Sequence, residues 1–192
     1  IGGGTGGTGT GNVNVGTITS TSNGLVLNGA TLNVATAATG NLNLFYDCAL
    51  TSGSLNQTGG TANVVFKAQG PAFTTPKYQS FTQGSATITG AININNGVTT
   101  NYCSVVFGSN INLGAGATLA ATNSNSYFDF ANFVLTGNAF TQSSNANIAT
   151  ANVDGFNSAG AIGSVQTSTR TYSASGSFIY SGTTAQVTGT GT

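Results

Sequence analysis

The sequence of 192 residues predicts an all-β protein, a right-handed parallel β-helix (β-solenoid) with units of about 22–24 residues. Short segments recur at a nearly constant spacing of about one such unit, and a repeat of about 20–50 residues is typical of stacked architectures. Apolar and polar residues alternate within these segments, as expected for strands with one buried face. No segment places apolar residues at helical spacing over a helix-length stretch, so we expect no α-helix.

The repeat is clearest between residues 30 and 67. The segment at residues 30–34 (ATLNV) recurs as residues 53–57 (GSLNQ), and the segment at residues 41–45 (NLNLF) recurs as residues 63–67 (NVVFK). In a parallel β-helix such units stack about 4.8 Å apart, with like residues over like. We therefore expect ladders of Asn and Thr on the outside and Leu, Ile, Val and Phe inside.

The N-terminal segment, residues 1–11, consists mainly of Gly and Thr and is interpreted as a linker or a loosely held first strand. Short strands are then expected to follow one another closely. The Asn-Gly pairs at residues 23–24 and 28–29 favour turns with positive φ. The strands predicted in this part of the chain cover residues 12–15, 17–19, 25–27, 30–34 and 41–46.

The repeat continues through the middle of the chain at Leu55, Ile88, Ile111 and Phe133. The intervals from Ile88 to Ile111 and from Ile111 to Phe133 match the unit seen earlier. The interval from Leu55 to Ile88 is about half as long again. These spacings predict that the four residues occupy equivalent positions in successive units.

The other strand of the later units is expected at residues 127–130 (YFDF) and 147–149 (NIA). The solenoid is thus assigned to residues 12–155. Beyond it the pattern weakens, and residues 156–192 are interpreted as a β cap, a β-hairpin or a junction to a next module. Strands in this last part are predicted at residues 167–172 and 177–180.

The single long interval, between Leu55 and Ile88, indicates a loop insertion at residues 67–79. This segment holds both prolines and both lysines of the chain, and proline cannot donate to a strand ladder. Insertions into repeats form loops that often lie on a binding face. A tolerated surface loop without function is the alternative. The residues that would form a binding loop are Lys67, Pro71, Phe73, Pro76, Lys77 and Tyr78.

The chain carries almost no charge, with 3% charged residues and a net charge of zero at pH 7. Nucleic-acid binding requires clustered Lys and Arg, which three scattered cations do not supply. No apolar run approaches the roughly 18 residues of a membrane-spanning helix. Without His and Glu, acid–base catalysis and metal binding have few candidate groups. We therefore expect a protein that is not an enzyme, with no catalytic residues, no metal and no cofactor.

Cys48 and Cys103 are separated by one ordinary interval and one long interval, which corresponds to two units of the stack. Residues two units apart on one line would lie about 9.6 Å from each other, whereas a disulfide requires Cα atoms within about 7 Å. The spacing therefore favours two buried free thiols. A disulfide is the alternative, because extracellular proteins favour bridged cysteines and the insertion can shift the register.

The C-terminal segment, residues 176–191 (GSFIYSGTTAQVTGTG), resembles a recurrent segment of long, repetitive surface proteins of Bacteroidota that are secreted by the type IX route. In those proteins the segment continues into Leu-Pro and a further strand repeat, which this sequence does not show. The resemblance implies a secreted or surface-anchored β-solenoid used for adhesion or as fibre material, without catalytic residues. Because the chain begins at Ile1 and not at Met, we expect a processed product or a piece of a longer protein.

The leading functional hypothesis is a structural role. The chain would be a subunit or repeat segment of an extracellular or cell-surface fibre, and its partners would be further copies or neighbouring repeats. The first unit has no charge and no proline to protect its strand edges from another strand. Val13 and Val15 are the residues expected in the self-assembly seam.

An adhesin module is the main alternative. Such a module would bind glycans or surfaces through a flat polar face or through the predicted loop. Tyr78, Phe81 or Tyr102 would supply aromatic stacking surfaces, although core packing is the more usual role for most such residues.

Ice binding through regular Thr rows is a less favoured third hypothesis. Residues 17–19 and 87–89 (both TIT) have the required alternation. The matching positions of other units hold Asn33, Asn56 and Asn112, which interrupt a continuous Thr array.

Overall fold

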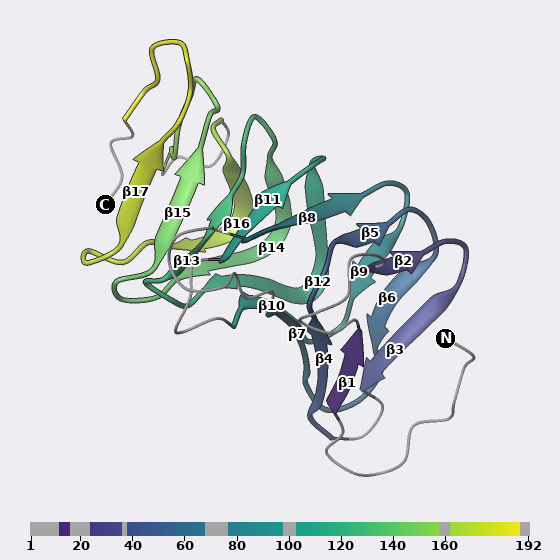
Figure 1. Ribbon diagram of the computed structural model, residues 1–192. Coiled ribbons are helices and arrows are strands. Elements are labelled where there is room, and N and C mark those ends of the chain that lie inside the picture. Colours follow the sequence, from purple (N-terminus) through teal and green to yellow (C-terminus); the bar gives the residue numbers. More distant parts are fainter. Residues whose placement is uncertain are drawn as a thin grey trace.

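The computed structural model describes residues 12–15, 24–35, 38–67, 77–97, 103–157 and 162–188. These residues form 17 strands and no helix, and the strands belong to three sheets (Figure 1). Every strand pair in the sheets is parallel. The all-β class and the parallel strand arrangement predicted from the sequence are thus confirmed.

The first sheet, sheet A, has seven strands, and its neighbouring strands come from successive repeats of the chain. In their order across the sheet, these strands are β1 (Asn12–Val15), β4 (Gly40–Leu44), β7 (Ala62–Phe66), β10 (Ile92–Asn96), β12 (Ile111–Ala121), β14 (Leu135–Gln142) and β16 (Val165–Thr171).

Two further sheets are built in the same way. The seven strands of sheet B are β2 (Leu25–Leu27), β5 (Cys48–Leu50), β8 (Lys77–Gln83), β11 (Cys103–Phe107), β13 (Ser126–Asp129), β15 (Asn147–Thr150) and β17 (Ser177–Tyr180). The three strands of sheet C are β3 (Thr31–Ala35), β6 (Ser54–Gln57) and β9 (Thr87–Thr89). From β3 to β11 the chain visits sheets C, A and B in turn, so each unit adds one strand to each sheet.

From β12 onward, one long strand takes the place of the separate strands of sheets C and A. The first half of β12 lies beside β9. Gly90 directly follows β9, and its N–H donates to the carbonyl of Ala115 in β12 at 3.2 Å. The pairing of β12 with β14 shifts register between Leu113 and Thr118. Gly116, inside this shift, has a φ of 85°, which glycine adopts without the strain of a side chain.

The strand register confirms the predicted repeat in the first half of the chain. Leu32, Leu55 and Ile88 stand in register across sheet C. In sheet A, Asn41 stands in register with Asn63, as the repeat of residues 41–45 in residues 63–67 predicts.

The predicted equivalence of Ile111 and Phe133 is wrong, because Ile111 pairs with Leu135. A turn precedes Leu135 and accounts for the two extra residues. In this turn Ala131 has a φ of 47°, and the N–H of Phe133 donates to the carbonyl of Phe130 at 2.8 Å. The regular spacing alone predicts a strand position for Phe133, which instead lies in this turn.

The last part of the described chain continues the same two sheets. β16 pairs in parallel with β14, and β17 pairs in parallel with β15. The β-hairpin interpretation of residues 156–192 is therefore wrong for β16 and β17, which lie in different sheets. Figure 1 places β1, β2 and β3 at one end of the molecule and β17 at the other.

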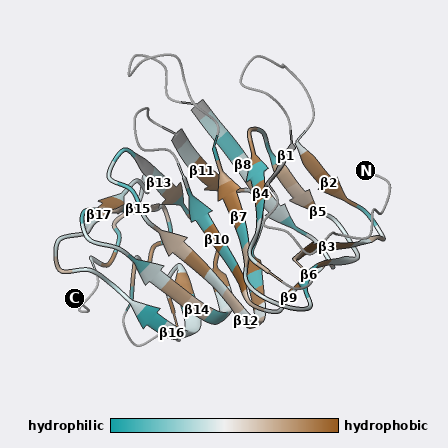
Figure 2. Cartoon of the chain, turned by 90° about the horizontal axis from the view of Figure 1, so that it is seen from below, coloured by the Kyte–Doolittle hydropathy of each residue, from teal (hydrophilic) through white to brown (hydrophobic). Residues whose placement is uncertain are grey.

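Hydrophobic and hydrophilic residues alternate along many of the strands (Figure 2), and the hydrophobic ones build a core between the sheets. One buried row crosses sheet A. Aromatic rings from β7 to β17 also meet in this core, where neighbouring ring centroids are 4.8–6.4 Å apart. The buried row contains Leu42, Val64, Ile94, Leu119 and Phe140. The aromatic residues are Phe66, Phe81, Phe107, Phe128, Phe130, Phe140, Phe156, Tyr172, Phe178 and Tyr180.

Candidate functional site

The first candidate site is the N-terminal edge, which we define as β1, β2 and β3. Within the described part of the chain, each of these strands pairs on one side only. Val13 stands in register with Leu42, and Val15 with Leu44. Since Leu42 and Leu44 are buried, the two valines predicted for the assembly seam occupy positions that continue two buried rows of sheet A.

In sheet C the inner row is more exposed at β3 than at the strands that follow it. Leu32 is partly exposed, whereas Leu55 and Ile88, which follow it in the same row, are each 1% exposed. In sheet B the first strand differs, because Leu25 and Leu27 of β2 are only 6% and 5% exposed. The residues of β1, β2 and β3 include no charged side chain and no proline, the features with which proteins commonly protect an edge strand.

The second candidate site is the outer face of sheet A, where side chains form a ladder along the stack. The amide of Asn63 donates to Asn41 at 2.8 Å, and the amide of Asn93 donates to Asn63 at 3.4 Å. The hydroxyl of Thr118 continues the ladder by donating to Asn93 at 3.2 Å. The ladders of Asn and Thr predicted from the sequence are thus present, and they tie successive units to one another.

Sheet C carries two outer rows of polar side chains. The amide of Asn56 donates to Asn33 at 3.0 Å, and the hydroxyl of Thr89 donates to Asn56 at 2.7 Å. In the other row, Ser54 donates to Thr31 at 3.0 Å. The first row combines two amides with a hydroxyl, and the second consists of hydroxyl residues, with Ser54 between Thr31 and Thr87. Neither row is the continuous Thr array that ice binding favours. Residues 17–19 lie outside the described residues.

The predicted binding loop is described only at its two ends. Lys67 directly follows β7, and its N–H donates to the carbonyl of Leu44 at 2.7 Å. Lys77 and Tyr78 belong to β8, so a strand begins before the predicted end of the insertion at residue 79. The other three predicted loop residues, Pro71, Phe73 and Pro76, lie outside the described residues.

The aromatic residues predicted as stacking surfaces have different surroundings. Phe81 is 1% exposed and belongs to the aromatic core, so it offers no binding surface. Tyr78 is 57% exposed and shares a row on the outer face of sheet B with Ser104 and Tyr127. Burial raises the pKa of Tyr127, and the nearby Tyr78 and Asp129 add to this rise. Tyr102 lies outside the described residues.

The two cysteines do not share a line in the stack. Cys48 stands in register with Phe81, whereas Cys103 stands in register with Lys77, the first residue of the same strand β8. Cys48 is a buried free cysteine, and burial raises the pKa of its thiol to about 12, with a smaller contribution from Asp47. The register thus places the two cysteine backbones farther apart than the predicted two units, which disfavours the alternative of a disulfide.

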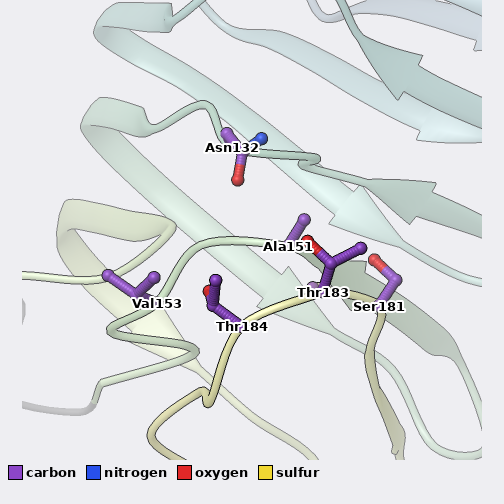
Figure 3. Close-up of a pocket in the computed structure, with 7 residues that line it drawn as sticks. Asn132, Ala151, Val153, Ser181, Thr183 and Thr184 are labelled. Carbon is purple, nitrogen blue, oxygen red and sulfur yellow. The ribbon is translucent and has the colours of Figure 1, made fainter.

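A shallow cavity of about 340 Å³ lies near the C-terminal end of the stack (Figure 3). It forms where three successive corner loops meet, and its lining contains hydroxyl, amide and apolar groups without charge. Gln186 holds one wall in place: it accepts from the N–H of Gly182 at 2.7 Å and donates to the carbonyl of Asn152 at 2.8 Å. The lining residues are Asn132, Ala151, Val153, Ser181, Gly182, Thr183 and Thr184.

Sequence reasoning did not find this cavity, because its residues come from loops far apart in the chain that only the stacking brings together. The sequence feature that coincides with the cavity is the Thr183-Thr184 pair, which lies inside residues 176–191. Its neutral hydroxyl and amide groups could donate and accept hydrogen bonds. The described residues that line it include no acid or base that would activate a hydroxyl there.

The carboxylates of Asp47 and Asp129 bind backbone groups. Asp47 accepts from the N–H of Ser80 at 2.7 Å, and Asp129 accepts from the N–H of Ala131 at 2.8 Å. Among the described residues, no group of three or more His, Cys, Asp or Glu side chains could hold a metal ion. In the same part of the chain, no helix has the length and apolar character needed to cross a membrane.

Comparisons of this chain with protein-family models, with curated proteins and with solved structures found no match. Its function has to be inferred from its own residues.

Proposed function

We propose that this chain is a structural segment of an extracellular or cell-surface fibre, a right-handed parallel β-helix that associates through the strand edges of its N-terminal edge. The observation that carries the proposal is the one-sided strand pairing of the first layer. Leu32 is partly exposed at the start of a row that is otherwise buried, and the three strands of this layer pair on one side only within the described chain. The partner is a second copy of the chain or a neighbouring repeat.

The physical driving force is strand pairing together with burial of the core's open end. An edge strand presents backbone donors and acceptors already aligned for another strand, and each new ladder bond contributes about 1 kcal/mol. A net charge of zero leaves almost no long-range repulsion between copies. Association should therefore depend little on salt, in contrast to association driven by charge.

The bonding between successive units also suits a structural role. Parallel ladders join the backbones of successive units, side-chain ladders join their outer faces, and aromatic rings fill the inside. The proposal assigns no reaction and no cofactor to the chain. The scarcity of charge and the resemblance of residues 176–191 to secreted surface proteins support the extracellular location.

Replacing both Val13 and Val15 by Lys is expected to abolish association. The two charges would be placed in register with the buried rows of Leu42 and Leu44, and burying an unpaired charge costs several kcal/mol. We expect the association constant to fall by about 100-fold or more, measured by sedimentation equilibrium at low and high salt.

The matched control places one charge on the other face of the same strand. Asn12 stands in register with Asn41, which is only partly buried, so Asn12→Lys adds a charge outside the seam and is compared with Val13→Lys alone. It should retain most of the association. A wild-type chain that remains monomeric at high concentration in both salts would contradict the proposal.

An adhesin module that binds neutral glycans is the second candidate, because Tyr78 is 57% exposed on the outer face of sheet B in the same row as Tyr127. Aromatic faces of this kind stack on sugar rings. A monomeric chain that binds a neutral polysaccharide, and loses this binding in Tyr78→Ala but not in Val26→Ala, would favour the adhesin over the fibre. Val26 serves as the control because it is an exposed apolar residue of the same sheet.

A further inference from the structure

Sheet B ends on both sides in an uncharged strand. β2 and β17 are its terminal strands, and within the described chain each of them pairs on one side only. Neither strand contains a charged residue or a proline, the residues that commonly prevent another strand from adding to an edge. The C-terminal layer thus offers a second edge for strand addition, besides the N-terminal edge.

The backbone of β2 has bonding groups that face its free edge. In a parallel sheet, successive residues of a strand bond alternately to its two neighbours. The N–H of Leu25 donates to the carbonyl of Asp47 at 2.9 Å, and the carbonyl of Leu27 accepts from the N–H of Thr51 at 2.8 Å. Since Leu25 and Leu27 bond toward β5, the backbone of Val26 between them faces the free edge.

The backbone of β17 has bonding groups that face the free edge at the other end. The N–H of Ser177 donates to the carbonyl of Ala146 at 3.0 Å, and the N–H of Ser181 donates to the carbonyl of Thr150 at 2.8 Å. The odd-numbered residues of this segment therefore bond toward β15, and the even-numbered residues bond away from it. The residues whose backbone faces the free edge are Phe178 and Tyr180.

One register of parallel pairing satisfies both edges. In a parallel pair, a residue that bonds across lies opposite a residue whose backbone points away. Val26 of a second copy therefore stands beside Ile179 and bonds to Phe178 and Tyr180. In this register the inner residue Leu25 lies beside Phe178, so the inner faces of the two strands also coincide.

The exposed side chains at the two ends fit the same register. Val26 is 67% exposed and Ile179 is 40% exposed, and each alternates along its strand with less exposed inner residues. Placed side by side in one outer row, the two side chains would cover each other, as apolar cross-strand neighbours do. Phe178, which is partly exposed in the last layer, would be covered by the added strand.

We propose that copies of this chain join head to tail, with β2 of one copy added in parallel to β17 of the next, so that sheet B continues through the contact. This inference rests on the proposed function and names the surface that the N-terminal edge meets. Each assembly then keeps one free edge of each kind, and growth has no fixed end point.

The side-chain ladders have the direction that a head-to-tail contact extends. In sheet A the later unit donates to the earlier one, from Asn93 to Asn63 and from Asn63 to Asn41. The rows of sheet C have the same direction. A head-to-tail contact keeps this direction, whereas two N-terminal edges facing each other would bring donor ends together.

Sheet A contributes less apolar contact than sheet B. Arg170 on β16 stands in register with Phe140, so the buried row of sheet A ends in a charged residue. A nitrogen of its guanidinium donates to the carbonyl of Thr167, and Arg170 has a further interaction within the chain. A following layer would thus cover a charge that already has partners, which is far less costly than covering an unpaired one.

The test replaces the apolar pair by charges and measures association by sedimentation velocity at low salt over a wide range of concentration. Val26→Lys and Ile179→Asp each place a charge beside an apolar residue in the contact, so each should lower the association constant by about tenfold. In the double variant every contact joins a Lys of one copy to an Asp of the next. Opposite charges at cross-strand positions attract, so its association should return to within about threefold of the wild type.

The matched control adds the same charge away from both ends. Thr87 is exposed on β9, which lies inside the stack, so Thr87→Asp should associate like the wild type. Circular dichroism establishes that each variant has folded. If one of the two charged variants does not fold, the pair with exchanged charges, Val26→Asp and Ile179→Lys, repeats the test.

The outcomes separate this inference from the proposed function. An Ile179→Asp variant that associates like the wild type, or a double variant no stronger than Val26→Lys, would overturn the head-to-tail contact and leave association through the N-terminal edge intact. A wild-type mass that levels off at two copies would do the same. A wild-type chain that stays monomeric would overturn both.

Discussion

Replacing Phe107 by Ala is expected to lower the free energy of unfolding by about 3–5 kcal/mol. Phe107 is 1% exposed and lies at the centre of the aromatic core. Its ring centroid is 5.7 Å from that of Phe81, 6.3 Å from that of Phe128 and 4.8 Å from that of Phe130. Together these rings span successive layers of the stack, so the cavity left by the substitution cannot be closed by one neighbour alone.

Denaturant unfolding followed by circular dichroism measures this change. The control is Val26→Ala on the same sheet, because Val26 is 67% exposed, and surface substitutions usually change stability by less than about 0.5 kcal/mol. Equal effects of the two substitutions would show that the aromatic rings do not form one packed core.

Replacing Gln142 by Leu is expected to destabilise the folded state by about 2–4 kcal/mol, since each buried polar group left without a partner costs about 1–3 kcal/mol. Gln142 is 2% exposed, and its amide donates to the carbonyls of Ala146 at 2.9 Å and Ser177 at 3.3 Å. Its carbonyl accepts from the N–H of Ser173 at 3.4 Å. One side chain thus holds the corner between two successive layers.

The matched control is Gln166→Leu. Gln166 is only partly buried, and its amide donates to the carbonyl of Gly163 at 3.0 Å. Thermal and denaturant unfolding should show a clearly larger loss for Gln142→Leu. A loss no larger than that of the control would mean that the corner bonds are replaced by water without cost.

The strand rows could be predicted wherever the repeat was regular. The regular interval predicts that Leu32 and Leu55 share a row, and the recurring strand pattern after the long interval adds Ile88, because alternation determines which residues face the core. The ladder of Asn41 and Asn63 follows from the same period.

The register of the other strands could not be predicted, because it depends on connections whose length varies from unit to unit. The connection from β4 to β5 is short, spanning residues 45–47, whereas residues 67–76 connect β7 to β8. Counting along the chain therefore does not give the register between Cys48 and Cys103. Such loops can change length at little cost to the stack.

Arg170 escaped the sequence analysis for a related reason. It lies in a segment rich in Ser and Thr, where no alternation identifies the inner face. Only its pairing with Phe140 places it at the end of a buried row. The Gly-rich bend in β12 also could not be predicted. The pairing of β12 with β14 shifts register between Leu113 and Thr118, so one continuous strand takes the place of two separate strands in the earlier units.

Small-angle X-ray scattering of the purified chain over a range of concentrations tests association through the N-terminal edge most directly. Seven strands in sheet A at about 4.8 Å spacing give one stack a length of about 30 Å along its axis, and each added copy lengthens the assembly by a similar amount. We expect the maximum dimension to rise with concentration, equally at low and high salt. A maximum dimension that stays at the value of a single stack at every concentration would contradict this account.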